Sequence, residues 1–67
     1  MNIQINGEKH EIRSGETLAG LVKTLHAQKK QRIAVLLNDD LISADKQAGH
    51  ILKEGDRVEI LTFAGGG

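Results

Sequence analysis

The chain lacks cysteine, proline, tryptophan and tyrosine, and Phe63 is the one aromatic residue among its 67. Without cysteine it can form no disulfide and no thiolate zinc site, and it has no thiol nucleophile. A chain near 60 residues buries only about 60% of the surface that its unfolded form exposes, so we expect one domain of limited stability. So few residues can hardly enclose a pocket of roughly 300–1,000 Å³. These absences argue against an enzyme that acts alone and favour a small module that works with partner proteins.

An excess of charge of either sign is also missing, because 9 Lys and Arg balance 9 Asp and Glu. A neutral chain has no general attraction for nucleic acid or anionic lipid. The densest basic segment, Lys29-Lys30-Gln31-Arg32, has no aromatic residue for base stacking and is typical of a solvated loop. No apolar run approaches the ~20 residues of a membrane helix, and the start of the chain does not resemble a secretion signal. We therefore expect neither a nucleic-acid nor a membrane partner, and a cytoplasmic location.

Patterns of catalytic and metal-binding side chains are missing as well. The three histidines, His10, His26 and His50, have no helical i, i+4 spacing and no zinc-type glutamate beside them. Ser14 and Ser43 lack the glycines that flank a nucleophilic serine. We predict no metal site, and surface positions for the histidines.

The first residues alternate in polarity. Ile3 and Ile5 lie on one face of residues 2–6, as in a half-buried strand. Asn6-Gly7 suits a two-residue hairpin turn, because both central residues of such a turn adopt positive φ. The return segment, Glu8–Arg13, is mostly polar, which predicts an edge strand whose charges discourage pairing with another chain.

A helical pattern follows at the spacing i, i+3, i+4, i+7. Thr17 is the predicted N-cap, since its hydroxyl can accept a hydrogen bond from a backbone N–H one turn later. The apolar stripe behind it predicts a helix that packs on one surface; it consists of Leu18, Leu21, Val22 and Leu25.

The second half of the chain predicts strands joined by short connections. Residues 33–37 form a continuous apolar run, which is typical of a central strand covered on both faces. Residues 41–42 are a candidate short strand, and the polar connection 43–50 has room for a helical turn. Residues 54–56 predict a turn.

The last segment, residues 57–63, alternates again. Its two predicted faces are Val58, Ile60 and Thr62 on one side, and Arg57, Glu59, Leu61 and Phe63 on the other. Together the elements predict an α+β fold of the β-grasp kind, with a mixed four- to five-stranded sheet and one main helix across one face. We expect the first and last strands to be neighbours at the centre. Residues 1–63 form this domain, and residues 64–67 a flexible tail.

That tail, Ala64-Gly65-Gly66-Gly67, directly follows an alternating strand. No helix and no lysine follow these glycines, so they do not resemble a phosphate loop. Glycine has no Cβ, so such a tail can extend into a tunnel that would reject any side chain. Its carboxylate is inert until activated, for example by adenylation. The outward Leu61 and Phe63, just before the tail, are then explained by a partner surface.

These residues resemble the ThiS family of sulfur-carrier proteins from thiamine biosynthesis, which are ubiquitin-like β-grasp domains. The resemblance covers the whole chain. It is most specific in residues 54–60, Glu-Gly-Asp-Arg-Val-Glu-Ile, followed by the terminal Phe-Ala-Gly-Gly-Gly. It is also carried by residues 3–7, by Glu16-Thr17-Leu18, and by the segment 33–38. Residues 42–47 depart from the family pattern, because they contain neither the proline nor the tryptophan that often occurs there.

The resemblance implies a function without enzymatic activity of the chain itself. The carboxylate of Gly67 would be adenylated with ATP by an E1-like adenylyltransferase of the ThiF kind, and a persulfide donor would convert it to a thiocarboxylate. The thiocarboxylate would supply sulfur to a thiazole synthase of the ThiG kind. The chain would bind no cofactor and be a monomer when free. The implied partner contacts are Gly66, Gly65, Ala64, Phe63 and Leu61.

Other functions remain open at this point. The same carrier chemistry serves molybdopterin and other sulfur metabolites, and the sequence does not separate these pathways. A TGS-like β-grasp module would bind a partner without using the tail, and a protein modifier would form isopeptide bonds through it.

Overall fold

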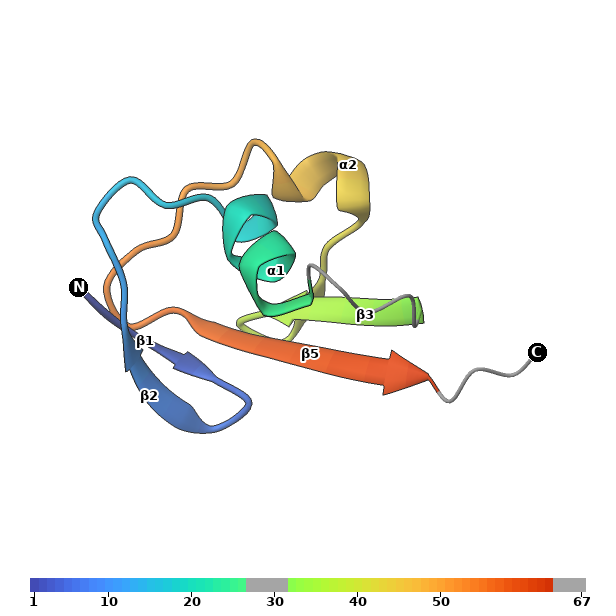
Figure 1. The fold of residues 1–67 in the computed structure, drawn as a ribbon, viewed down its shortest axis with the longest axis horizontal. Coiled ribbons are helices and arrows are strands. Elements are labelled where there is room, and N and C mark those ends of the chain that lie inside the picture. The colour runs from blue at the N-terminus through green and yellow to red at the C-terminus, as the bar shows by residue number, and fades with distance from the viewer. Residues whose placement is uncertain (27–31, 64–67) are drawn as a thin grey trace.

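We analysed a computed structural model of the chain, in which residues 1–26 and 32–63 are described. Lys29, Lys30 and the predicted tail, residues 64–67, lie outside the described residues. Figure 1 shows one sheet with a helix across one face. The elements, in chain order, are β1 (Asn2–Ile5), β2 (Glu8–Glu11), α1 (Leu18–His26), β3 (Arg32–Leu37), β4 (Asp40–Leu41), α2 (Ala44–Gln47) and β5 (Arg57–Phe63).

The sheet has five strands in the order β2-β1-β5-β3-β4. The pairs β1–β2, β3–β5 and β3–β4 are antiparallel, and β1–β5 is parallel, so the sheet is mixed as predicted. The expected neighbours, β1 and β5, do pair, with Gln4 opposite Arg57 and Ile5 opposite Val58. This arrangement confirms the β-grasp prediction and makes β5 the central strand.

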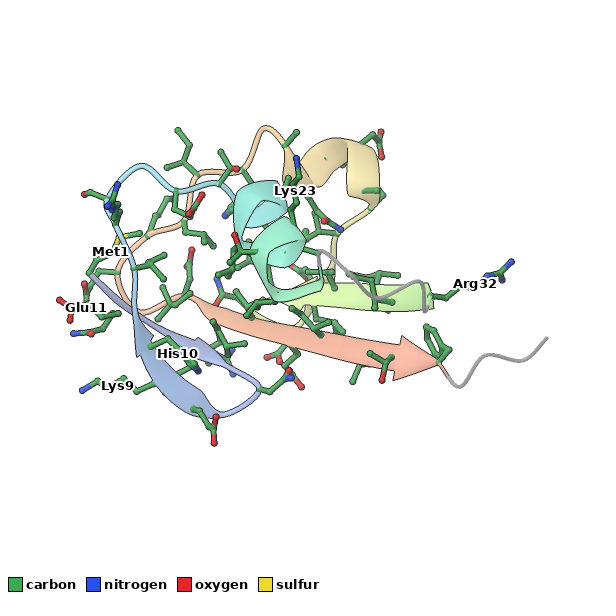
Figure 2. The ribbon with its side chains drawn as sticks, in the orientation of Figure 1. Met1, Lys9, His10, Glu11, Lys23 and Arg32 are labelled. Carbon is green, nitrogen blue, oxygen red and sulfur yellow. The ribbon has the colours of Figure 1, made fainter. Side chains whose placement is uncertain are left out.

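The hairpin between β1 and β2 is built as its sequence predicts. Asn6 and Gly7 have φ values of 50° and 83°, as a primed turn requires, and glycine adopts such a φ without steric cost. Ile5 and Glu8 form the pair next to the turn. Strand β2 is exposed along its whole length at the sheet edge, and Figure 2 shows Lys9, His10 and Glu11 projecting from it. Its charges protect this edge.

Helix α1 begins with the predicted cap. The Gly20 N–H donates to Thr17 Oγ1 over 3.1 Å, which satisfies one of the free N–H groups of the first turn. Leu18 and Leu21 are buried and Val22 is half-buried, whereas Leu25, the last position of the apolar stripe, is exposed. The helix therefore packs on the sheet through its first two turns.

One core lies between α1 and the inner face of the sheet. Every strand of the central trio β1, β5 and β3 contributes alternate residues to it, as a half-buried sheet requires. The buried apolar residues are Ile3, Ile5, Leu18, Leu21, Val35, Leu37, Leu52, Val58 and Ile60.

The prediction that residues 33–37 are covered on both faces is wrong. Val35 and Leu37 are buried under α1, but Ala34 and Leu36 are only half-buried. The described residues place no second layer on their side of the sheet, so β3 is apolar on a face that the fold leaves partly open. The shorter elements were predicted correctly, since β4 lies within one residue of its expected place and α2 lies in the polar connection. In the described part of the chain, no helix is both long and apolar enough for a membrane span.

Candidate functional site

Strand β5 separates two kinds of side chain. Val58 and Ile60 point into the core and are 1% and 7% exposed, whereas Leu61 and Phe63 point away from α1 and are 47% and 53% exposed. The predicted face assignment is therefore confirmed. Large apolar side chains held outward at the end of a central strand form a surface that a partner protein can cover. Figure 1 shows β5 running to one end of the sheet, where the described part of the chain ends.

Strands β3 and β4 extend this apolar surface. Ala34 pairs with Leu61, and Leu36 pairs with Leu41, which is 71% exposed. Opposed residues of an antiparallel pair share a face, so these side chains lie on the same open side of the sheet as Leu61. We call Ala34, Leu36, Leu41, Leu61 and Phe63 the outer apolar face. Sequence reasoning missed Leu36 and Leu41, although the unbroken apolar run of β3 signalled apolar residues on both faces.

The opposite end of β5 is fixed by polar contacts. Asn38 Nδ2 donates to Asp56 Oδ1 over 3.1 Å, and the Arg57 N–H donates to Asn38 Oδ1 over 2.9 Å. Asp56 Oδ2 accepts the Lys53 N–H at 2.9 Å. Asn38 and Asp39 have φ values of 51° and 74° and form the β3–β4 turn, a conformation that Asn and Asp tolerate better than other residues with side chains. One turn thus holds the start of β5.

Asp56 is the one group whose pKa is shifted in the described residues. Burial of its carboxyl raises the pKa, but the Lys53 N–H, the Asn38 amide and the positive charges of His50 and Lys53 together outweigh burial and lower it. The net pKa lies below the ordinary value of 3.8. Asp56 therefore acts as a charged acceptor that organises the turn before β5.

His10 and His50 each lie near one carboxylate in the described part of the chain. His10 Nε2 lies 3.9 Å from Glu8 Oε1 on exposed β2, and His50 Nε2 lies 3.9 Å from Asp56 Oδ2. Nowhere in residues 1–26 and 32–63 do three metal-ligating side chains come together. His50 is only half-buried, and its contact with Asp56 belongs to the turn that fixes β5.

Of the predicted site residues, the structure describes Leu61 and Phe63. Both lie at the end of β5 and face outward, on the same side as the rest of the outer apolar face. Ala64, Gly65, Gly66 and Gly67 lie outside the described residues. The contribution of these four residues to a site stays a prediction.

Comparison with known proteins agrees with the fold. Residues 3–67 match the model of the ThiS family. A thiazole synthase of Magnetococcus marinus is 36% identical over 67 residues, which are all of this chain but 20% of that protein. The chain thus spans about a fifth of the length of the curated relative that it matches.

Two solved structures are similar over the whole chain. The crystal structure of the thiamine biosynthesis protein (ThiS) from Geobacter metallireducens has a TM-score of 0.82 and 28% identity, with all of both chains covered. An NMR solution structure of a thiamine biosynthesis protein from the same organism has a TM-score of 0.75 and 29% identity, with all of this chain and 88% of that one covered. The family model and the solved structures agree with the mixed sheet described above. The chain belongs to the ThiS family of sulfur-carrier proteins of thiamine biosynthesis.

Proposed function

We propose that this chain carries sulfur as a thiocarboxylate on Gly67 and delivers it for formation of the thiazole ring of thiamine. The observation that carries the proposal is the pair Leu61 and Phe63, held outward at the end of β5 directly before the glycine tail. An activating enzyme that covers these side chains would receive the following residues in its active site. The chain itself is then a co-substrate rather than an enzyme, and it binds no cofactor of its own.

The tail supplies the reacting group. In this proposal Gly67 ends the polypeptide, and residues 64–67 form a tail outside the folded domain of residues 1–63. Gly65 and Gly66 have no side chain, so an extended backbone fits a narrow tunnel that leads to the enzyme's nucleotide site. Ala64 is the largest residue after Phe63. The sequence of the tail therefore supports entry into a confined site.

The chemistry requires only partner groups and this carboxylate. A Gly67 carboxylate oxygen attacks the α-phosphorus of ATP, and pyrophosphate leaves, so the product is an acyl-adenylate. The terminal sulfur of a persulfide donor then attacks the acyl carbon, and AMP leaves. A thiol finally cleaves the sulfur–sulfur bond, which forms a disulfide on the donor side and releases the thiocarboxylate. Activation turns a poor leaving group into a good one, so no catalytic side chain of the carrier is needed.

The partners follow from this sequence of steps. We propose an E1-like adenylyltransferase of the ThiF kind, a persulfide donor and a thiazole synthase of the ThiG kind. The match to part of a thiazole synthase supports the last of these. We further propose that the free carrier is a monomer and that it works in the cytoplasm.

The experiment is loading of the purified chain by its activating enzyme with ATP and a persulfide donor. The intact mass should rise by the difference between one sulfur and one oxygen atom, and fragmentation should place the change on Gly67. Deletion of Gly66 and Gly67 should abolish the mass change and leave the unfolding curve unchanged. An unchanged mass with a competent enzyme that forms the complex would refute the carrier chemistry.

The same experiment separates the alternatives. A covalent conjugate on a target lysine in place of the thiocarboxylate would indicate a protein modifier. Undiminished partner-dependent function after deletion of Gly66 and Gly67 would indicate a binding module that does not use the tail. Consumption of the thiocarboxylate by another sulfur acceptor, with no transfer to thiazole synthase, would move the chain to another pathway.

A further inference from the structure

The side chain of Asn6 connects the first hairpin to the middle of β5. The ladder between β1 and β5 ends at Ile5, opposite Val58. Beyond it, the Asn6 N–H donates to the Val58 carbonyl over 2.9 Å, and the Ile60 N–H donates to Asn6 Oδ1 over 2.8 Å. The side-chain oxygen thus continues the ladder by one step where the backbone already turns toward β2. Because Ile60 is 7% exposed, loss of this acceptor would leave a nearly buried N–H unpaired.

The same asparagine is followed by glycine in an open turn. Asn6 and Gly7 are exposed, and a Cβ built at Gly7 would meet no heavy atom within 4 Å apart from its chain neighbours. Within residues 1–26 and 32–63, no hydrogen bond engages the Gly7 N–H or Asn6 Nδ2. Glycine also has no side chain that would hinder its own nitrogen. The turn therefore places an unobstructed backbone nitrogen next to a side-chain amide whose NH₂ group is unbound.

Asparagine is one of the thermolabile residues of proteins, and this pair of groups allows its deamidation. The Gly7 nitrogen gives its proton to a base of the solvent and attacks Asn6 Cγ, and ammonia leaves after taking a proton from water. The product is a five-membered succinimide. Water then opens the ring at either carbonyl, which yields aspartate or isoaspartate at position 6. The net reaction consumes one water molecule and releases one ammonia, so it requires no enzyme and no oxidant.

The folded turn keeps the reacting atoms apart. The positive φ values of Asn6 and Gly7 are those of a type I′ turn, in which ψ of the first central residue is about +30°. This ψ turns the Gly7 nitrogen away from Asn6 Cβ, and the bond from Ile60 holds the side-chain amide toward β5. Ring closure therefore requires the turn to open and that bond to break.

We propose that Asn6-Gly7 is a site of spontaneous deamidation that the fold controls, and that isoaspartate at position 6 releases the hairpin from β5 at Ile60. Isoaspartate runs the main chain through Cβ and Cγ, so the two-residue turn gains one backbone atom. The oxygen that accepts the Ile60 N–H then belongs to a main-chain carbonyl. Because Leu61 and Phe63 lie just beyond Ile60, the change loosens the base of the outer apolar face. The proposal does not depend on the sulfur chemistry.

The first test ages the purified chain in mildly alkaline buffer, once folded and once unfolded in urea. Peptide mapping should find the exchange of NH₂ for OH in the tryptic peptide 1–9, and chromatography should separate the aspartate and isoaspartate products. The unfolded chain should react at Asn6 about tenfold or more faster than the folded chain, because the reaction follows opening of the turn. Equal rates in the two states would overturn the proposal.

Asn38 provides the internal control for this test. It is followed by Asp39, whose side chain hinders attack by the backbone nitrogen, so Asn38 should stay intact while Asn6 reacts in the unfolded chain. Equal modification of Asn6 and Asn38, or no modification of Asn6 in urea, would also overturn the proposal.

The second test measures the release of β5 in the isolated isoaspartate fraction under folding conditions. Hydrogen exchange at the Ile60 amide should accelerate by about tenfold or more relative to the unmodified chain. The Leu21 amide, which donates to the Thr17 carbonyl over 3.0 Å in α1, should keep its protection. Unchanged exchange at Ile60 would refute the release, and so would equal acceleration at Leu21, because it indicates general unfolding.

Asn6→Asp is the matched control for the second test. It adds the same charge as deamidation but keeps the normal backbone and a side-chain oxygen that accepts from the Ile60 N–H. Exchange at Ile60 should therefore stay within about twofold of the unmodified chain. If Asn6→Asp accelerated this exchange as much as isoaspartate does, the added charge would account for the effect and the proposed role of the backbone change would be wrong.

Discussion

The first half of β5 is held from both sides and from the preceding turn, whereas its last three residues pair with β3 alone in the described chain. At the start, Arg57 and Val58 lie between β1 and β3, and the Arg57 N–H is bound by Asn38. The Ile60 N–H donates to Asn6 Oδ1 over 2.8 Å, so the first hairpin also reaches this half. Beyond Ile60 the described residues provide no such support, and Leu61 and Phe63 are exposed.

This difference separates stability from recognition along one strand. The firmly held half supplies core residues and anchors the domain, while the outer half presents apolar side chains next to the tail. In the proposed function the last residues enter an enzyme, and a rigid base would fix the direction in which they leave the domain. The two halves should therefore respond differently to substitution.

The largest expected effect is on the core side of the held half. Ile60→Ala should lower the free energy of unfolding by about 2–4 kcal/mol, because it removes buried methyl groups and leaves a cavity. The measurement is denaturant unfolding followed by circular dichroism. Leu61→Ala, one residue further and outward, is the matched control and should cost about 0.5 kcal/mol or less. Similar losses for both variants would remove the distinction between the two faces.

A smaller effect is expected at the turn that anchors β5. Asp56→Asn should destabilise the chain by about 1–3 kcal/mol at neutral pH, since a charged acceptor of buried hydrogen bonds is lost. The pKa of Asp56 is lowered in the folded chain, so its contribution is complete above the ordinary value of 3.8 and disappears as pH falls through the folded pKa. The unfolding free energies of the two proteins should therefore converge in acid.

The control for this prediction is the neighbouring Asp39. Its carboxylate forms an exposed ion pair with Arg57 over 3.0 Å, and exposed pairs contribute little. Asp39→Asn should change stability by about 0.5 kcal/mol or less at every pH. A gap between Asp56→Asn and the unsubstituted chain that persists below the folded pKa would show that shape, rather than charge, accounts for the effect.

The smallest effect on stability is expected at the open end. Phe63→Asp should leave unfolding within about 0.5 kcal/mol of the unsubstituted chain, because the side chain is already half in water. The same variant should slow loading by the activating enzyme, measured as the initial rate of thiocarboxylate formation. A normal loading rate would show that Phe63 is not part of the docking surface. A large loss of stability would show that Phe63 contributes to the folded domain itself.

Much of the fold was predictable because its signals are local. Asn6-Gly7 specified the first turn, Thr17 the helix cap, and the alternation of residues 57–63 which side of β5 is buried. Each depends on backbone geometry or on a period of two or 3.6 residues, and both can be read in one short segment. The outward positions of Leu61 and Phe63 followed from the same alternation.

The remaining features depend on contacts between distant segments. An apolar run such as residues 33–37 has the same pattern whether one or both faces of the strand are covered. The described chain places no second layer over Ala34 and Leu36, so these two side chains are only half-buried. The association of Asn38 with Asp56 and Arg57 spans a turn and a long connection, so no local pattern announces it.

The sequence by itself determined the fold class and the two faces of β5, because these follow from the periodicity of its apolar residues. Only the tertiary structure decided that Leu36 and Leu41 join the outer apolar face. It likewise decided that the buried Gln47 of α2 donates to the Ile42 carbonyl just after β4. The physical reason is that pairing and burial are properties of two segments at once, and their register is fixed only when the sheet has formed.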